Sequence, residues 1–401
     1  MIDPLIFVRS IHFAATALVG GTVFFMVLVA DVPALRTRMN AMIWSALAVA
    51  IVSGAAWLVL VAAEILGGSI ADVCLHGGAW QVASDTRFGT VSCARFALAL
   101  LLGGLMLWPK ARVSQLIMAT LLVALLAFIG HAGTAPGLAG NVHLASDIVH
   151  LIAASAWLGG LPALVLLLGN NEASIAGATR RFSRLGILCV GALAASGAIN
   201  SWNLLGAPID LLTTDYGRWL SCKIGLFGAM VCIAAINRYH LTPRLPEPSA
   251  KRALRRNSLC EIGLGLGVLL IVGVLGTMIP TAHVHSAPAG IPPDAAFVHI
   301  HTVEAMADVT IDPGRAGTAS AVIRVSREDF TEFTAKSVRL ALDPPGNGAG
   351  AVESAARRMV DGVWKIDRLE IGQPGIWTVR VIVTSETGNS IVLDAPVVID
   401  R

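Results

Sequence analysis

Long apolar runs constrain this chain more than any other feature of its sequence. Eight of them, each with at most two charged residues, lie at 5–30, 41–66, 89–108, 113–130, 143–168, 185–205, 217–237 and 258–279. About 20 apolar residues in a helix are enough to cross the hydrocarbon core of a bilayer. The sequence therefore predicts an all-α polytopic membrane domain over residues 1–285, with eight transmembrane helices.

Composition excludes several other classes of protein. Only 14% of the 401 residues are charged, against about 25% in a typical soluble domain. A soluble monomer with this balance would have too little polar surface to cover itself, and disorder, coiled coil, collagen and nucleic-acid binding are disfavoured. The sequence contains no phosphate loop, no catalytic-triad motif and no HExxH motif, so no enzyme activity is predicted.

The loops between the apolar runs differ in charge. Thirteen Lys and Arg residues lie in loops 31–40, 109–112, 169–184 and 238–257. The opposite loops, 67–88, 131–142 and 206–216, contain only Arg87. Basic loops of membrane proteins stay in the cytoplasm, so both termini are predicted to lie outside.

The first four runs resemble the last four, which predicts an internal duplication into two parallel four-helix repeats. Each repeat has a small-residue run ending in two glycines, a Ser-Gly-Ala motif, a Thr-x-aromatic-Gly motif with a cation six residues later, and a histidine after its last run. The matching segments are Gly20-Gly21 and Gly159-Gly160, Ser53-Gly54 and Ser196-Gly197, Thr86 to Arg95 and Thr214 to Lys223, and His131 and His283. The glycine pairs also predict close helix contacts.

Nine of the ten histidines fall on the predicted outer side, and imidazole is the commonest metal ligand. His143, Asp147 and His150 are spaced i, i+4 and i+7, so they share one helix face. His12 lies at a similar depth, about 10 Å below the outer surface. One interpretation is an outer metal site formed by His12, His143 and His150, with His131 nearby; the other is a polar network that holds helices together.

Arg95 and Lys223 occupy equivalent positions near the outer ends of their spans. Either cation pairs with Asp147 or Glu64, or its long side chain reaches the interface alone. Both alternatives remain open from the sequence.

Further ligand candidates lie outside the spans. Two HxH pairs, His283 with His285 and His299 with His301, flank a Pro- and Gly-rich linker at 286–294. On a strand, residues i and i+2 project from the same face, so one pair can share a metal ion, to which Met306 could add a thioether. Cys74 and His76 form a weaker candidate, since Cys74 could equally pair with Cys93 or be inert.

Beyond the linker, residues 295–401 show short alternating runs separated by Pro- and Gly-containing turns. The runs are 307–311, 319–325, 338–342, 363–366, 377–383 and 391–399. Six or seven strands in about 105 residues predict a C-terminal all-β immunoglobulin-like sandwich. Trp364 and Trp377 are predicted to fill its core.

The membrane part resembles the CopD copper-resistance proteins. The resemblance is carried by His12 before Gly20-Gly21, Gly130-His131, Asp147-x2-His150 before Trp157-x-Gly159-Gly160, and Thr214-x-Tyr216-Gly217 with Lys223 and Asn237-Arg238. The tail, from His299-x-His301 through Met306 to Gly375-x-Trp377, is similar to the YtkA-like extracytoplasmic β-domain, which is akin in shape to CopC. The resemblance implies a copper protein of the bacterial inner membrane, with its C-terminal domain in the periplasm.

Three functions are compatible with these observations. The first is transport of copper from the periplasm toward the cytoplasm, with a CopC-type periplasmic chaperone as a possible partner and no nucleic acid involved. The second is a b-type haem protein for electron transfer, which a visible spectrum would reveal. The third is a copper sensor or assembly factor that transports nothing. The oxidation state of the copper does not follow from the sequence.

Overall fold

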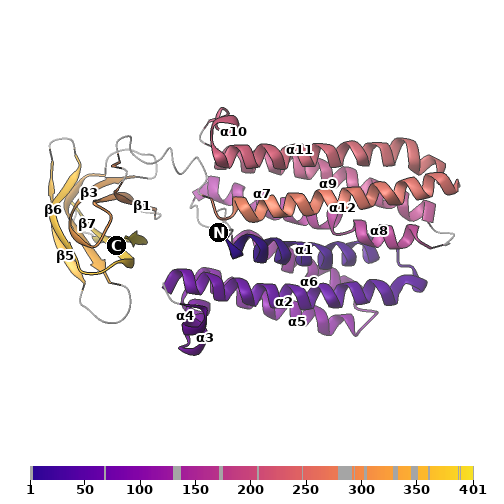
Figure 1. The fold of residues 1–401 in the computed structure, drawn as a ribbon, viewed down its shortest axis with the longest axis horizontal. Coiled ribbons are helices and arrows are strands. Elements are labelled where there is room, and N and C mark those ends of the chain that lie inside the picture. The colour runs from indigo at the N-terminus through magenta and orange to yellow at the C-terminus, as the bar shows by residue number, and fades with distance from the viewer. Residues whose placement is uncertain are drawn as a thin grey trace. The chain divides into compact units, whose positions relative to one another are not determined.

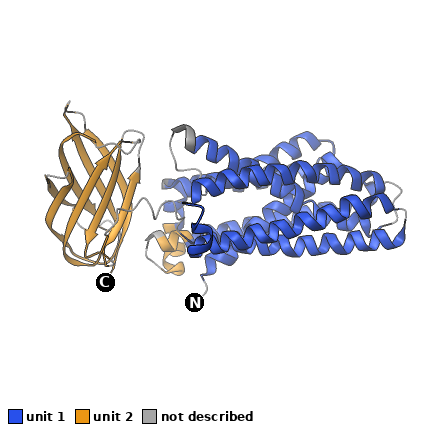
Figure 2. Ribbon diagram, turned by 90° about the horizontal axis from the view of Figure 1, so that it is seen from above, with its two compact units in different colours: residues 1–60, 79–134, 138–284 blue, residues 61–78, 135–137, 285–401 orange. Residues whose placement is uncertain are grey.

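The computed structural model describes most of the chain, in two compact units (Figure 2). The described residues are 3–66, 69–129, 137–170, 175–205, 207–245, 247–278, 291–292, 294–301, 305–327, 333–344, 351–359, 362–386, 388 and 390–400. The first unit comprises residues 1–60, 79–134 and 138–284, and the second comprises 61–78, 135–137 and 285–401. The predicted linker at 286–294 falls mostly outside the described residues, so the proposed domain boundaries stay a prediction.

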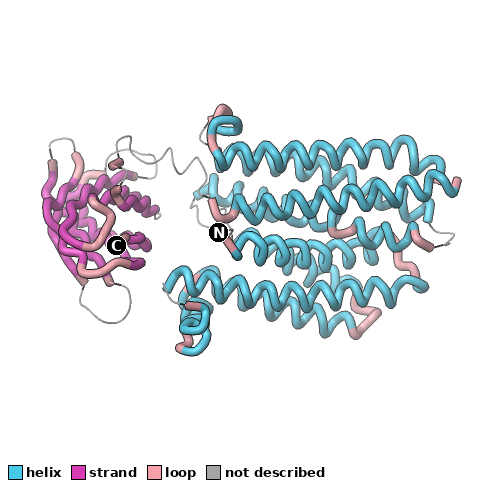
Figure 3. The backbone as a smooth tube through the Cα atoms, viewed as in Figure 1, coloured by secondary structure: helices cyan, strands magenta, loops and turns pink. Residues whose placement is uncertain are grey.

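The chain up to residue 278 is helical and the C-terminal part is made of strands, as the colours of Figure 3 show. The helical elements (Figure 1) are α1 (Pro4–Phe24), η1 (Phe25–Val29), η2 (Pro33–Leu35), α2 (Arg36–Leu66), α3 (Ile70–Leu75), α4 (Gly78–Asp85), α5 (Arg87–Met106), α6 (Arg112–Ala124), η3 (Leu125–Phe128), α7 (Gly137–Leu158), α8 (Leu161–Leu168), α9 (Ile175–Leu204), α10 (Asp210–Thr213), α11 (Asp215–Ile236), η5 (Asn237–Leu241), η6 (Thr242–Arg244) and α12 (Pro248–Leu275).

Among the described residues, seven helical segments are long and apolar enough to cross a membrane, which confirms the predicted polytopic class. The fourth predicted span is the shorter apolar segment Arg112–Phe128, formed by α6 and η3. At the rises of α- and 3₁₀-helices its 17 residues extend about 27 Å, close to the thickness of the hydrocarbon core, about 30 Å.

The surface of these helices is apolar and their interior contains polar groups, the arrangement expected of a bundle in lipid. Val52, Leu100 and Leu188 are each at least two-thirds exposed. His12, Arg95 and other ionisable side chains are buried instead. The bundle therefore hides polar groups from an apolar surrounding, the reverse of a soluble protein.

The two glycine pairs make close helix contacts, as predicted. A Cβ atom on Gly21 of α1 would overlap the backbone of Gly159, where α7 ends, and a Cβ atom on Gly159 would overlap the carbonyl oxygen of Ala17. The Ser155 hydroxyl donates a hydrogen bond of 3.0 Å to that same carbonyl. The equivalent first helices of the two repeats thus cross where their backbones almost touch.

Repeated caps support the predicted duplication. The Thr86 and Thr214 hydroxyls accept hydrogen bonds of 3.0 and 3.1 Å from the backbone N–H groups of Gly89 and Gly217, at the starts of α5 and α11. Each hydroxyl also donates to a carbonyl four residues earlier. A Cβ atom on either glycine would overlap the backbone of the short helix before it, so both repeats use the same turn.

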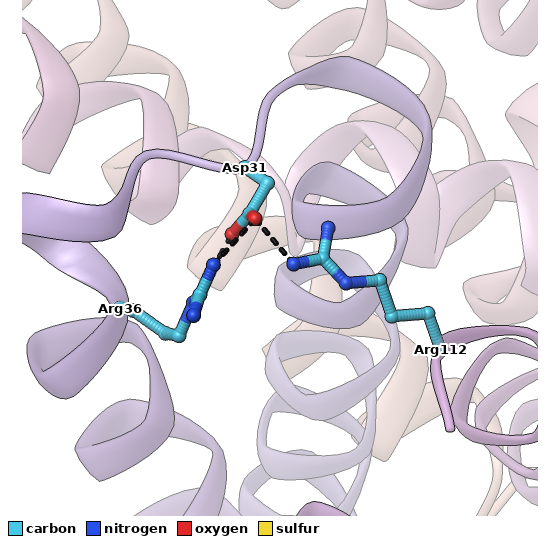
Figure 4. Close-up of polar contacts among 3 residues, drawn as sticks. All are labelled: Asp31, Arg36 and Arg112. Carbon is cyan, nitrogen blue, oxygen red and sulfur yellow. Dashed lines mark hydrogen bonds and ion pairs between the residues drawn. The ribbon is translucent and has the colours of Figure 1, made fainter. Parts of the chain in front are cut away.

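At the end of the bundle with basic loops, Asp31 ties two connections together (Figure 4). It forms ion pairs with Arg36 at the start of α2, at 2.6 Å, and with Arg112 at the start of α6. Burial opposes ionisation of Asp31, but the hydrogen bonds and charges of the two arginines outweigh it and lower the pKa of the carboxyl. The acid therefore stays ionised and offsets part of the positive charge at this end.

The C-terminal part is an antiparallel β-domain, which confirms the predicted all-β class. Its strands are β1 (Ala296–His301), β2 (Met306–Asp312), β3 (Gly317–Ser326), β4 (Ala335–Asp343), β5 (Val352–Arg358), β6 (Trp364–Ile371), β7 (Gly375–Ser385) and β8 (Ser390–Ile399). The strand order is β1-β2-β3-β6-β5-β4-β7-β8. Trp364 and Trp377 are buried in its apolar core, as predicted.

We predict that Gly21→Ala destabilises the bundle by about 1–3 kcal/mol, since a methyl group there overlaps the Gly159 backbone. Gly104→Ala is the matched control, because nothing lies within 4 Å of a Cβ atom at that position of α5. Thermal unfolding of both variants in one detergent gives the comparison. Equal unfolding midpoints for the two variants would contradict the tight crossing.

Candidate functional site

In the first repeat, a histidine and an arginine are buried together. His12 of α1 and Arg95 of α5 are 5% and 4% exposed. The Arg95 Nη2 atom lies 2.8 Å from His12 Nε2 and 3.2 Å from the Thr16 hydroxyl, and its Nη1 atom donates to the Leu122 carbonyl. Arg95 thus contacts a neutral histidine and a backbone carbonyl. The sequence left two alternatives for Arg95, an ion pair with an acidic residue or a side chain that reaches the membrane interface, and the structure shows neither.

These contacts fix which nitrogen of His12 carries the proton. A guanidinium group only donates, so His12 Nε2 accepts from Arg95. His12 Nδ1 then carries the hydrogen, and it lies 3.0 Å from the Ala50 carbonyl and 3.1 Å from the Ser53 hydroxyl. Both ring nitrogens of His12 are therefore engaged within the protein.

The second repeat reproduces this arrangement with one difference. His150 Nδ1 of α7 lies 3.0 Å from the Ser196 hydroxyl of α9, and that hydroxyl donates to the Ala192 carbonyl. The serine oxygen therefore accepts from His150, as Ser53 does from His12. The cation here is Lys223 of α11, which interacts electrostatically with Asp147 as well as with His150.

Asp147 gives the second site its distinct character. Its Oδ1 atom accepts a hydrogen bond of 3.2 Å from Asn200 Nδ2, and Lys223 is its positive neighbour. Lys223 and Asp147 line the same cavity and interact electrostatically, but no ion pair between them is described, so their pairing stays a prediction. No described hydrogen bond engages Nε2 of His150, in contrast to His12.

The two sites open onto cavities of very different size. His12 and Arg95 line a cavity of about 20 Å³, room for about one water molecule. His150, Asp147 and Lys223 line one of about 510 Å³. Asp147 and Lys223 also line a neighbouring cavity of about 290 Å³, together with His143.

The predicted face of α7 is therefore real, because His143, Asp147 and His150 line adjoining cavities. His12 lines a different cavity, and no group of three or more His, Cys, Asp or Glu residues in the described ranges is arranged to hold a metal ion. His131, His283 and His285 lie outside the described residues. The metal-binding roles of these histidines stay predictions.

In the β-domain, the HxH pair of β1 faces two further candidate ligands. His299 is paired with Asp308 of β2 and His301 with Met306 in the antiparallel register. His299 Nδ1 lies 2.5 Å from Asp308 Oδ1. Directly opposed residues lie on the same face of a sheet, so these four residues share one face. The side chain of His301 is outside the described set.

The weaker candidates remain isolated. Cys74 and Cys93 are both exposed free thiols, so the disulfide considered for them is absent. His76 is exposed, and its Nδ1 atom contacts the Asp72 carbonyl. Glu64, considered as a partner of the buried cations, is exposed on α2.

Sequence reasoning missed the residues that orient the histidines. In the sequence, Ser53 and Ser196 stand out only as members of a repeated Ser-Gly-Ala motif. Each repeat has one such motif and one intramembrane histidine, and this coincidence was the only sign that the serine contacts the histidine. Asn200 and Asp308 gave no signal, because their partners are distant in sequence or lie on another strand.

Comparison with known proteins gives matches over the helical part. The model of the copper resistance protein D-like N-terminal domain matches residues 1–141, and the copper resistance protein D model matches residues 176–275. The two matches fall on the first and second repeats respectively.

Three curated relatives align with the chain. Inner membrane protein YebZ of Escherichia coli is 31% identical, over 68% of this chain and 97% of the relative. Copper resistance protein D of Pseudomonas syringae pv. tomato is 28% identical, over 57% and 68%. Copper transport protein CutJ of Bacillus subtilis is 28% identical, over 64% of this chain but only 46% of the relative.

Proposed function

We propose, since this chain belongs to the copper resistance protein D family of membrane proteins, that it carries copper across the bacterial inner membrane from the periplasm toward the cytoplasm. The names of two relatives, a copper transport protein and an inner membrane protein, support this proposal. The observation that carries it is the polar face of α7, where His143, Asp147 and His150 line two adjoining cavities inside a membrane bundle.

His150 is the central ligand in this proposal, ahead of His12. Its Nδ1 hydrogen is held by Ser196, which leaves the Nε2 lone pair available for a metal ion. His12 Nε2 already accepts from Arg95, which would have to move before copper could bind. A ring nitrogen whose partner nitrogen is hydrogen-bonded is the usual state of a metal-ligating histidine.

Lys223 opposes the entry of a cation, and Asp147 offsets that charge. An arriving copper ion would compete with Lys223 for the Asp147 carboxylate, so release of the lysine accompanies binding in this proposal. Asn200 keeps the carboxylate in place during the exchange through its hydrogen bond.

The proposed orientation follows from the loop charges. The connections with Arg36, Arg112 and Arg238 lie at the end of the bundle opposite the N-terminus of α1 (Figure 1). Basic loops face the cytoplasm, so in this proposal the start of α7 and the β-domain face the periplasm. There His299, His301 and Met306, with Asp308 orienting His299, form the proposed capture site.

We predict that His150→Ala abolishes copper accumulation by cells, because the central nitrogen ligand is lost. Asp147→Asn should weaken accumulation less, since an amide oxygen still fills the position. His240→Ala is the control, because this exposed histidine lies at the other end of the bundle. Cellular copper is measured at matched amounts of protein in the membrane, and normal accumulation by the His150 variant would exclude the site.

For the β-domain, we predict that His299→Ala with His301→Ala removes one bound copper ion from the purified full-length protein. Asp308→Asn should lower that affinity about 10–100-fold, because loss of a histidine's hydrogen-bond partner typically has this effect. His76→Ala should change nothing. Copper titration in the presence of a competing chelator gives the stoichiometry, and an unchanged double variant would remove the capture site.

The size of the second-repeat cavity favours one other candidate function. About 510 Å³ of space lined mainly by apolar side chains, with one histidine, lies within the range of cofactor sites. A b-type haem ligated by His150 would fit this description. We predict no Soret absorption from protein purified out of haem-replete cells; a Soret band that His150→Ala removes would favour haem over copper.

A further inference from the structure

A second polar cluster lies in the second repeat where α11 passes into η5, and none of the predicted ligands belongs to it. Glu261 of α12 is 1% exposed, and its Oε1 atom accepts a hydrogen bond of 2.6 Å from Asn237 Nδ2. Asn237 Oδ1 in turn accepts one of 2.9 Å from Asn257 Nδ2. These contacts place a carboxyl group deep in a membrane-spanning helix with a single side-chain hydrogen bond.

A cavity of about 220 Å³ adjoins this carboxyl group. Ser258 and Thr179, which also line it, are 0% and 3% exposed. Their hydroxyl oxygens have no hydrogen-bond partner among the described residues. An unsatisfied buried polar group costs about 1–3 kcal/mol, so two of them on residues that line one cavity beside a carboxyl group indicate a site built for something polar.

The charges around the cavity do not neutralise Glu261. Arg238 and Tyr239 of η5 are the other titratable side chains in the described lining, while α7, α8, α9 and α11 contribute none. Arg238 donates to the Ser183 hydroxyl at 2.8 Å, and its guanidinium carbon lies 5.7 Å from the centre of the Tyr239 ring. No ion pair joins Arg238 to Glu261 within the described structure.

We propose that Glu261, Ser258 and Thr179 form a binding site for a small hard cation, a proton or an alkali-metal ion, reached from the end of the bundle that has the basic loops. Its donors are oxygens only, which suit hard cations, whereas copper(I) prefers sulfur. The cation supplies the positive charge that Glu261 lacks, and an alkali-metal ion would also occupy the two hydroxyl oxygens.

The local backbone supports a binding role over simple helix pinning. The chain leaves α11 through the π-helical turn η5, an irregularity that is frequent at functional sites. This turn positions Asn237, whose carbonyl accepts a hydrogen bond of 2.7 Å from the Thr242 hydroxyl. A network that only held helices together would be expected to satisfy its own hydroxyl groups, and here two are left over.

The test uses copper-free, full-length protein in lipid nanodiscs, so its result is independent of the proposed copper transport. Infrared spectra and thermal unfolding midpoints are recorded between about pH 5 and pH 9, the range spanned by perturbed carboxyl groups. One series contains sodium and the other choline at equal ionic strength. Glu261→Gln is compared with Glu247→Gln, which alters an exposed glutamate just before α12.

For a proton, the wild type and Glu247→Gln should show a titrating carboxylic-acid component that is missing from the spectrum of Glu261→Gln. For an alkali-metal ion, sodium should raise the unfolding midpoint of the same two proteins and leave Glu261→Gln unchanged. Ser258→Ala, which keeps the carboxyl group, should weaken sodium binding about tenfold, the effect of losing one hydroxyl ligand. Other carboxyl groups, Asp147 among them, contribute equally to the wild type and to Glu261→Gln. The absence of any difference between these two proteins in both measurements would therefore overturn the proposal.

Discussion

The absence of water from the bilayer core is the constraint on which the rest of this structure depends. A polar side chain in a span must find its partner inside the bundle, because lipid offers none. His12 therefore has three protein partners, Asp147 has an amide and a lysine, and Ser53 and Ser196 donate to their own helices. The glycine crossing of α1 and α7 allows the two repeats to pack closely enough to enclose these groups.

The two histidine sites lie at matching places of the repeated motifs, and they differ in the cation beside the histidine. An arginine in the first repeat reaches both a histidine and a carbonyl, and it fills the space around them. A lysine at the equivalent position is shorter and has one charged head, so the second repeat keeps an acid beside it and large cavities around it. The two repeats thus hold a closed polar contact in one case and a polar group beside a large cavity in the other.

The β-domain follows different rules, because its core is formed from alternating strands that bury Trp364 and Trp377. Periodicity therefore located most of its strands. Two strands lie outside the predicted runs, β1 (Ala296–His301) and β5 (Val352–Arg358), and β5 is the less regular of them. The sequence of β5 contains no run of apolar residues at alternate positions, and this segment becomes a strand by pairing with β4 and β6.

The sequence by itself determined the spans, the loop charges and the shared face of His143, Asp147 and His150, because these depend on residues close together in the chain. Hydropathy located the apolar part of each membrane-spanning helix but placed some helix ends wrongly. The helix α9 begins at Ile175, ten residues before the predicted span, because its first turns are amphipathic and are not detected as an apolar run. Only the tertiary structure decided that Arg95 binds His12, that His12 and His150 line separate cavities, and that Glu261 meets Asn237. Those partners lie on different helices, and helical periodicity contains no information about which faces meet across a bundle.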